Sequence, residues 1–227
     1  EEILGHVRDG ALEWIDMAYG PPMQQISRCL RSFFVAPKGK VLIAGDFSAV
    51  EGRGTAWFSG EEWKLRAFRA ADEKKGPGIY ELTASKTLGV PVESIGKDSP
   101  ERQMGKVQEL AFGYQGGVGA ARKFLPASLK NTPEKVLNQW KLAWRAAHPR
   151  IVQTWADLQS AAMAAVLNEG EMFTAGFPGR QAKFKKAGSF LWCQLPSGRV
   201  ACYPYPKLLA DRFGDRLTYM TVPSEND

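Results

Sequence analysis

The chain has few of the residues from which structural metal sites and disulfide frameworks are built. It contains three cysteines, Cys29, Cys193 and Cys202, and two histidines, His6 and His148. No two cysteines are spaced as C-x-x-C, so structural zinc is not indicated, and the low cysteine content favours a reducing compartment. No apolar run approaches the ~20 residues that span a bilayer, and no secretory leader is recognisable. These absences predict a cytoplasmic protein without a membrane segment.

Positive charge is only slightly in excess over negative charge. Thirty Lys and Arg against 24 Asp and Glu give a formal charge of +6, which permits binding to a polyanion without demonstrating it. Hydrophobic residues make up 44% of the 227 residues, enough for one substantial core or two small ones. The first residue is Glu1 and not Met, which favours a processed chain or a piece of a longer one.

Helical periodicity dominates the middle of the chain. A short helix is predicted over residues 11–19, stopped by a glycine and two prolines, and an extended stretch is expected to follow. The spacing of apolar residues predicts further helices over residues 62–71, 79–88, 100–114, 133–147 and 150–168. Trp140 and Trp144 share a face of one of them and are predicted to lie in the core.

Short β-rich runs lie toward both ends. Residues 33–36 and 40–45 predict an antiparallel pair that ends at Asp46, and residues 191–195 and 199–203 predict a hairpin. Across that hairpin the thiols of the last two cysteines would face each other, and reduced core thiols are favoured over a redox switch. Sheet on both sides of a long helical insertion predicts an α+β fold that is mostly helical.

Residues 99–117, S-P-E-R-Q-M-G-K-V-Q-E-L-A-F-G-Y-Q-G-G, place Arg102, Lys106, Leu110 and Tyr114 four residues apart on one predicted helix. At ~1.5 Å rise per residue the two cations sit about 6 Å apart and nearly in line, a span comparable with a triphosphate. Leu110 and Tyr114 continue the stripe and offer an apolar and an aromatic surface to a sugar and a base. A solvated surface helix is the competing interpretation.

The same helix has a predicted apolar back and a predicted start. Met104, Val107 and Ala111 fall on the side opposite the cations and are expected to dock the helix. Ser99 is the predicted N-cap, and Pro100 suits the first helical position because an N–H there would have no partner.

A carboxylate follows the predicted strand over residues 40–45. The segment V-L-I-A-G-D-F-S-A-V-E-G-R over residues 41–53 places Asp46 at the end of that strand and Glu51 five residues further on. Mg²⁺ is held by one or two carboxylates together with substrate phosphates, and phosphoryl transfer uses it to neutralise charge. Asp46 suits that role, and it would equally suit a cap on the following helix.

Together these segments resemble the family A DNA polymerases, the DNA polymerase I family, and in particular its phage and prophage members. D-F-S-A-V-E-G-R is similar to the family's motif A, and R-x-x-x-K-x-x-x-L-x-x-x-Y-x-G is similar to its motif B. The runs R-C-L-R-S-F-F-V-A-P-K-G-K, I-Y-E-L-T-A-S-K-T-L-G-V-P and L-P-S-G-R-V-A-C-Y-P are also phage-like, so the resemblance covers nearly the whole chain.

The resemblance implies template-directed DNA synthesis by a two-metal mechanism with two Mg²⁺ ions, with primer-template DNA and a dNTP as partners of a monomer. Asp46 would be one of two metal-binding aspartates, and the carbonyl of Phe47 would contribute to the second metal. Arg102 and Lys106 would hold the dNTP phosphates.

The resemblance also implies roles around the sugar and the base. Glu51 would be the steric gate that favours deoxynucleotides, which disfavours an RNA polymerase relative. Tyr114 would guard the base-insertion site, and Tyr80 would lie near the phosphates. Leu110 departs from the usual aromatic residue against which the sugar packs, and Gly105 costs ~1 kcal/mol of helix propensity relative to Ala.

The family's motif C, a His-Asp-Glu hairpin with the second aspartate, does not occur in the sequence. The chain is therefore interpreted as a fragment, inactive alone, with a helical fingers subdomain inserted between short antiparallel strands of an incomplete polymerase palm. The expected parts are a palm segment over residues 1–50 ending in the motif A strand, fingers over 51–187, and a return to the palm over 188–227.

The alternative is a non-catalytic nucleic-acid-binding module. It would use Lys183, Phe184, Lys185 and Lys186, together with arginines near the start of the chain, to hold a polynucleotide. A short run of this kind is also typical of a solvated surface.

Overall fold

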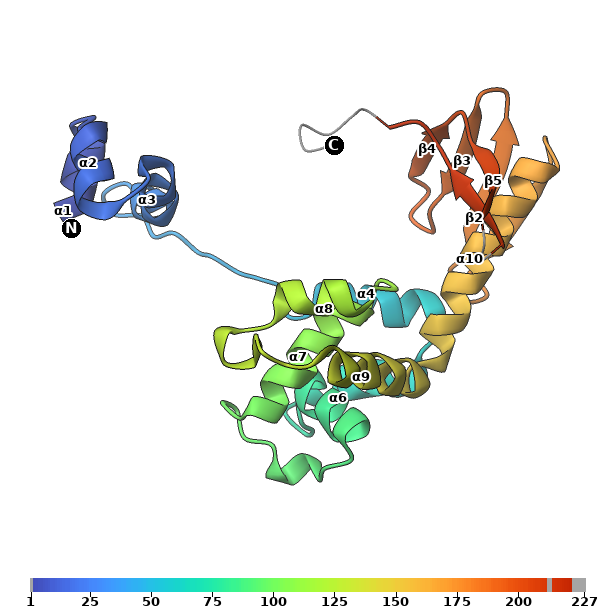
Figure 1. Ribbon diagram of the computed structural model, residues 1–227, viewed down its shortest axis with the longest axis horizontal. Helices are drawn as coiled ribbons and strands as arrows, with labels where there is room; N and C mark the ends of the chain where they lie inside the picture. Colours follow the sequence, from blue (N-terminus) through green and yellow to red (C-terminus); the bar gives the residue numbers. More distant parts are fainter. Residues whose placement is uncertain (1, 212–213, 222–227) are drawn as a thin grey trace. The chain divides into compact units, whose positions relative to one another are not determined.

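The computed structural model describes residues 2–211 and 214–221 and divides the chain into two compact units, residues 1–48 and 49–227. The first unit is helical, and Ile15, Gln25 and Cys29 are buried in it. Its helices are α1 (Glu2–Arg8), α2 (Leu12–Tyr19), α3 (Pro22–Cys29) and the 3-10 turn η1 (Leu30–Phe33) (Figure 1). The predicted helix over residues 11–19 is confirmed, whereas α3 replaces the extended stretch expected after it.

The predicted strand pair before Asp46 is wrong. Residues 34–47 contain no strand, and no strand occurs among the described residues of the first unit. Val35, Val41 and Ile43 are 74%, 81% and 92% exposed, so a ribbon here would bury no apolar face to stabilise it. Asp46 therefore lies on unpaired backbone and not at the end of a strand.

The second unit begins with helices. They are α4 (Val50–Ser59), α5 (Glu62–Asp72), α6 (Ile79–Leu88), α7 (Pro100–Phe112), α8 (Val118–Phe124), α9 (Glu134–Ala147) and α10 (Pro149–Leu167), with the 3-10 turns η2 (Val92–Ser94) and η3 (Ala127–Leu129). The helices predicted between residues 62 and 168 are all confirmed, with ends that differ by no more than two residues.

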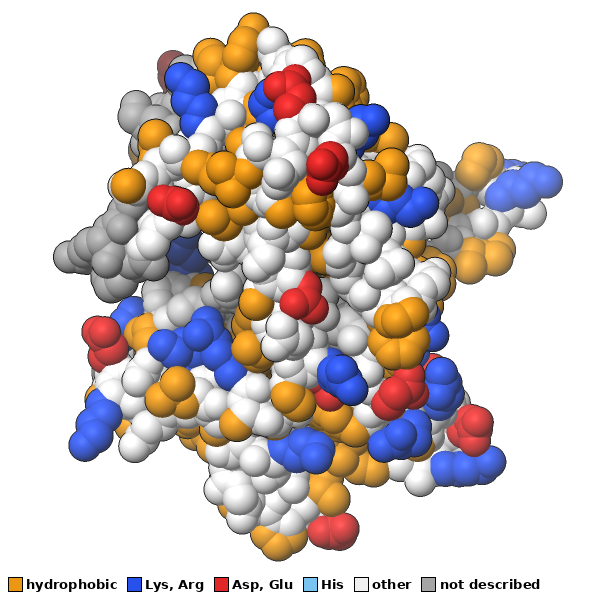
Figure 2. All heavy atoms as spheres, turned by 90° about the vertical axis from the view of Figure 1, so that its right-hand side faces the viewer, with side chains coloured by type: hydrophobic (Ala, Val, Ile, Leu, Met, Phe, Trp, Pro, Cys, Tyr) orange, Lys and Arg blue, Asp and Glu red, His pale blue; other side chains and the backbone are white. Residues whose placement is uncertain are grey.

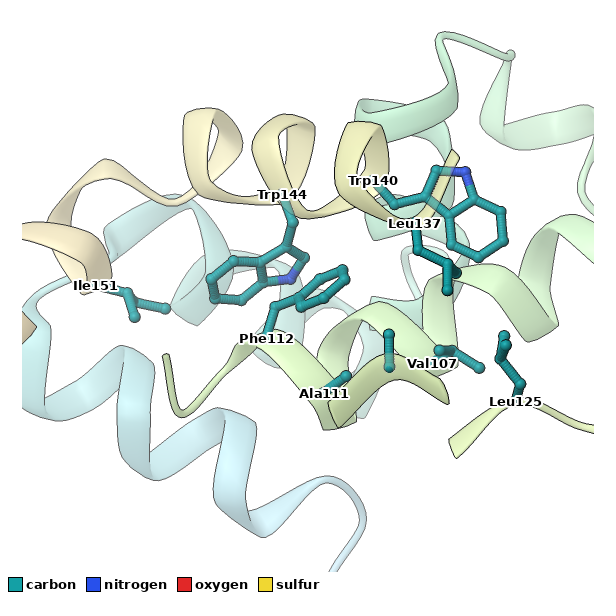
Figure 3. Packing of buried hydrophobic residues seen from close by; sticks show 9 residues of the cluster. Val107, Ala111, Phe112, Leu125, Leu137, Trp140, Trp144 and Ile151 are labelled. Atoms are coloured by element: carbon teal, nitrogen blue, oxygen red, sulfur yellow. The ribbon is translucent and has the colours of Figure 1, made fainter. Parts of the chain in front are cut away.

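These helices share a core that α7, α8 and α9 enclose (Figure 3). The rings of Phe112 and Trp144 lie with their centroids 6.4 Å apart, and Trp140 is also buried, as predicted. Glu61, in the link between α4 and α5, accepts hydrogen bonds from the backbone N–H groups of Arg150 and Ile151 at 2.9 and 3.3 Å. The buried Glu61 carboxylate thus satisfies free N–H groups at the start of α10.

After α10 the chain forms two antiparallel sheets. The larger has the order β1-β2-β3-β4, and the smaller pairs β5 with β6. The strands are β1 (Met172–Ala175), β2 (Ala182–Ala187), β3 (Phe190–Gln194), β4 (Val200–Pro204), β5 (Lys207–Asp211) and β6 (Gly214–Thr218). One face of the larger sheet packs on α10 (Figure 1). There Phe184 and Leu191 meet Ala161 and Ala162.

The predicted hairpin is confirmed as β3 and β4, but its two thiols do not face each other. Cys193 is paired with Ala201, and Cys202 is paired with Trp192. The register differs by one residue from the one that would oppose the cysteines, so the two thiols fall on opposite faces of the sheet. Cys193 is buried and Cys202 is exposed.

The mixed content of helices and antiparallel sheets confirms an α+β fold, and its division into fingers and palm stays a prediction. On the face that Figure 2 shows, Lys and Arg side chains are interspersed with acidic and hydrophobic ones. In the part of the chain that the structure describes, no helix has the length and hydropathy needed to cross a membrane.

Candidate nucleotide-binding site

Helix α7 carries the predicted row of cations, Arg102 and Lys106, and it is held in place by an N-terminal cap and a buried apolar side. The Ser99 hydroxyl accepts a hydrogen bond from the backbone N–H of Arg102 at 3.2 Å, and Pro100 occupies the first helical position. Val107 and Ala111 are buried in the helical core, with Met104 packed against it. The predicted cap and apolar back are therefore confirmed.

Arg102 is oriented by two residues of α6. Its Nε donates to Oε1 of Glu81 at 2.5 Å, and its guanidinium lies 5.5 Å from the centre of the Tyr80 ring. An arginine held between a carboxylate and an aromatic ring has a restricted orientation, and its terminal amino groups can still bind a phosphate. The structure thus brings together Arg102 and Tyr80, two of the predicted site residues.

Lys106 lies one helical turn further along α7 and is exposed. Within the described residues its ammonium forms no hydrogen bond or ion pair. A Lys in this state is a mobile point charge that can meet an incoming anion without first losing a partner. Leu110, the next residue of the row, is half-buried.

Helix α7 ends at Phe112, two residues earlier than predicted, so Tyr114 lies in the turn that follows. Gln115 has a φ of 63°, and a Cβ on Gly116 would overlap the carbonyl oxygen of Ala111. The chain after α7 therefore doubles back closely on the last helical turn, and this leaves Tyr114 61% exposed.

A cavity of about 380 Å³ brings Glu51 and Tyr114 together. It lies between the start of α4, the end of α7 and the middle of α10, and Phe58, Trp155 and Leu158 give it mainly apolar walls. A mainly apolar hollow with a few polar groups has the general composition of a small-molecule site.

Desolvation, together with the carboxylate of Glu51, raises the pKa of both tyrosines of the predicted site, Tyr114 and Tyr80. Desolvation raises the pKa of Tyr114, and the charge of Glu51 raises it further. Desolvation also raises the pKa of Tyr80, with additional contributions from the carboxylates of Glu109, Glu81 and Glu51. The upward shifts only reinforce the ordinary state of a tyrosine at neutral pH, in which the hydroxyl is protonated and can donate a hydrogen bond.

Gly105 has a role that its helix propensity did not reveal. It is buried, and a Cβ there would overlap the backbone carbonyl oxygen of Tyr80. The absence of a side chain thus allows α7 to approach α6 closely enough for Arg102 to reach Glu81. The sequence offered no partner helix for this glycine, so the requirement was not predicted.

Glu109 anchors the inward side of α7, a role that was not predicted from the sequence. Its carboxylate lies 2.5 Å from the buried ammonium of Lys64 and accepts hydrogen bonds from Thr83 at 2.8 Å and Trp144 at 3.0 Å. Burial by itself would raise the pKa of Glu109, but Lys64 and the neighbouring His148 lower that pKa to about 2. The carboxylate is therefore ionised and ties α5, α6 and α9 to α7.

Asp46 and Phe47 belong to the first unit, and both are exposed. The alternative that Asp46 caps the next helix is wrong, because α4 begins after Ala49 and has no side-chain cap. An exposed carboxylate is a hard oxygen donor that suits Mg²⁺. In the described ranges 2–211 and 214–221, no three His, Cys, Asp or Glu residues gather into a metal site. The convergence of Asp46 with the cations of α7 stays a prediction.

The run around residue 184 is divided between two faces of β2. Lys183 and Lys185 point outward, whereas Phe184 is 7% exposed and packs under α10. Phe184 therefore cannot stack on a base, as the alternative interpretation required. The alternation of a strand between its faces was a signal that could have predicted this.

Comparison with known proteins agrees with the motifs. No family model matches the chain. The chain is 40% identical over 215 residues to the DNA polymerase of Bacillus phage SP02, a match that covers 94% of this chain and 32% of that protein. It is 36% identical over 100 residues to DNA polymerase I of Aquifex aeolicus, covering 44% of this chain and 16% of that protein. With the thermostable DNA polymerase I of Thermus aquaticus the identity is 33% over 102 residues, 45% of this chain and 11% of that protein. The chain thus spans about a third of its phage relative and less of the others.

Proposed function

Since this chain belongs to the family A DNA polymerases, the DNA polymerase I family, and is of the phage type, we propose that it supplies the dNTP-binding fingers and part of the palm of a template-directed DNA polymerase. The observation that carries the proposal is the arrangement along α7 and in the turn after it: Arg102 is held by α6, Lys106 is unpaired within the described residues, and Tyr114 in the turn shares a cavity with Glu51. Charge is available for the phosphates, and an apolar hollow is available for the sugar and base.

Each residue of the proposed site has a separate role in binding the nucleotide. Arg102 and Lys106 bind the phosphates, and Tyr80 keeps the Arg102 guanidinium in place. Glu51 occupies the space that a ribose 2′-hydroxyl would need, and Tyr114 closes the base-insertion site. Leu110 offers a smaller apolar contact than an aromatic ring would. Phosphoryl transfer of this kind depends on positioning and charge neutralisation, which are the contributions these side chains can make.

Asp46, with the carbonyl of Phe47, would hold Mg²⁺ against those phosphates. The bound ions would neutralise phosphate charge and help align the attacking primer 3′-hydroxyl. The second aspartate of the family's two-metal site is not in this sequence. The proposal therefore assigns the complete reaction to a longer polymerase acting on primer-template DNA in the cytoplasm of a bacterial or phage-infected cell.

The test is Lys106→Ala in the full-length enzyme. We expect a KM for dNTP raised, or an incorporation rate lowered, by orders of magnitude, because a phosphate ligand is lost. Lys135→Ala, which removes an exposed lysine from α9, is the control and should leave both constants unchanged. Wild-type kinetics in the Lys106 variant would refute the assignment.

A further inference from the structure

The four-stranded sheet has a second face, opposite α10, that the nucleotide site does not use. Alternation along β2 and β3 turns Phe184 and Leu191 inward and leaves Lys183, Lys185 and Trp192 exposed. Residues directly opposite each other in an antiparallel pair lie on the same face. Lys185 is paired with Trp192, so a cation and an indole are neighbours on the outer face.

The charge of this face has one sign. The segments that form β1, β2, β3 and β4 contain three lysines and no Asp or Glu. Lys186 is bound to Glu169 at 2.6 Å, whereas Lys183 and Lys185 form no ion pair within the described residues. Two residues apart on a strand, these two ammonium groups are spaced by roughly 6.7 Å along it. The face is thus complementary to a chain of negative charges.

Aromatic surface accompanies the charge. Trp192 is 40% exposed and Phe190 is 37% exposed, and their ring centroids lie 5.4 Å apart at an angle of 40°. At the other end of the face, a polar hollow of about 360 Å³ is lined by Lys183, Gln181 and Gln194. Flat rings, amide groups and lysines recognise the bases and phosphates of an unpaired strand, whereas duplex DNA hides its base faces by stacking.

We propose that this outer face binds single-stranded DNA. Lys183 and Lys185 contact successive phosphates, Trp192 and Phe190 stack against bases, and Gln181 and Gln194 donate or accept hydrogen bonds at the hollow. An acidic peptide would satisfy the lysines but would leave the aromatic pair unused. Only the choice of DNA over RNA rests on the proposed polymerase function.

The experiment measures fluorescence anisotropy of a labelled oligothymidine titrated with the 227-residue chain at several salt concentrations. Trp192→Ala should weaken binding by about tenfold, the loss expected for one stacked base. Lys183→Gln with Lys185→Gln should weaken it and reduce the salt slope by about 1.4, since each phosphate contact to a single strand contributes ~0.7. Circular dichroism verifies that the variants are folded.

Lys74→Gln with Lys75→Gln is the matched control, because both are exposed lysines between α5 and α6 and their loss also removes two positive charges. It should leave the affinity and the slope unchanged. Equal effects of the control and the sheet variants, unchanged binding in all variants, or a preference for oligouridine over oligothymidine would each overturn the proposal. No nucleotide or metal is added, so failure here leaves the Lys106 test of the nucleotide site standing.

Discussion

At the scale of single residues, the Lys64–Glu109 pair decides how α7 is held. Both side chains are almost wholly buried, and Thr83, Trp144 and His148 surround the carboxylate. A buried charge that loses its partner costs far more than an exposed one, about 3–5 kcal/mol. The packing of α7 therefore depends on whether Lys64 and Glu109 are both ionised.

The pair gives a prediction about acid stability. The folded pKa of Glu109 is about 2, below its ordinary value of 4.5, so its stabilisation is complete above pH 4.5 and is lost as pH falls toward 2. Glu109→Gln should lower the free energy of unfolding by about 3–5 kcal/mol at pH 7, because Lys64 is left unpaired. Urea unfolding at pH 7 and pH 3 should give a smaller difference from wild type at the lower pH.

Glu62→Gln, at an exposed position of α5, serves as the control and should change little at either pH. The double variant Lys64→Met with Glu109→Gln should be more stable than Glu109→Gln alone, since the unpaired ammonium is removed. An equal loss at both pH values would show that Glu109 acts by its shape and not by its charge.

At the scale of elements, the contact between α6 and α7 positions Arg102, the proposed phosphate ligand. Arg102 reaches Glu81 and Tyr80 only because the two helices approach closely at Gly105. The atom that a Cβ at position 105 would meet is a backbone oxygen, which cannot rotate away as a side chain can. The distance between the two helices and the position of Arg102 are thus coupled through Gly105.

Gly105→Ala tests that coupling. Alanine is favoured over glycine in a helix by ~1 kcal/mol, but overpacking costs about 1–3 kcal/mol, so we expect a net loss of stability. Gly119→Ala in α8 is the control, because a Cβ there meets nothing within 4 Å, and it should be neutral or stabilising. Thermal unfolding of both variants measures the difference, and a stabilised Gly105→Ala would contradict the close approach.

At the scale of the whole molecule, the proposed function gives the chain one of the two aspartates that the family's reaction uses. We expect no primer extension from the 227 residues alone with Mg²⁺ and dNTPs, because a single carboxylate cannot hold two bridging ions. A gel-based extension assay measures this, with a full-length family member as the positive control. Metal-dependent extension by the isolated chain would show that another carboxylate completes the site.

Several parts of the fold and of the site were predictable from local sequence. The helices over residues 62–71 and 133–147 carry a clear apolar period, and the start of α7 has both a capping serine and a proline. The run over residues 40–45 favours a strand through its β-branched Val41 and Ile43, but among the described residues no strand pairs with it. Residue preference alone does not decide strand pairing, since a strand is stabilised by its neighbours.

The sequence by itself determined the family, the row of Arg102 and Lys106 on one helix, and the long helices between residues 62 and 168, because these depend on residues within a few turns of one another. Only the tertiary structure decided that Glu51 joins Tyr114 at one cavity, that Lys64 neutralises Glu109, and that Trp192, not Phe184, lies beside Lys185 on the outer face of the sheet. Those contacts join residues distant along the chain, and packing and strand register, not local periodicity, select them.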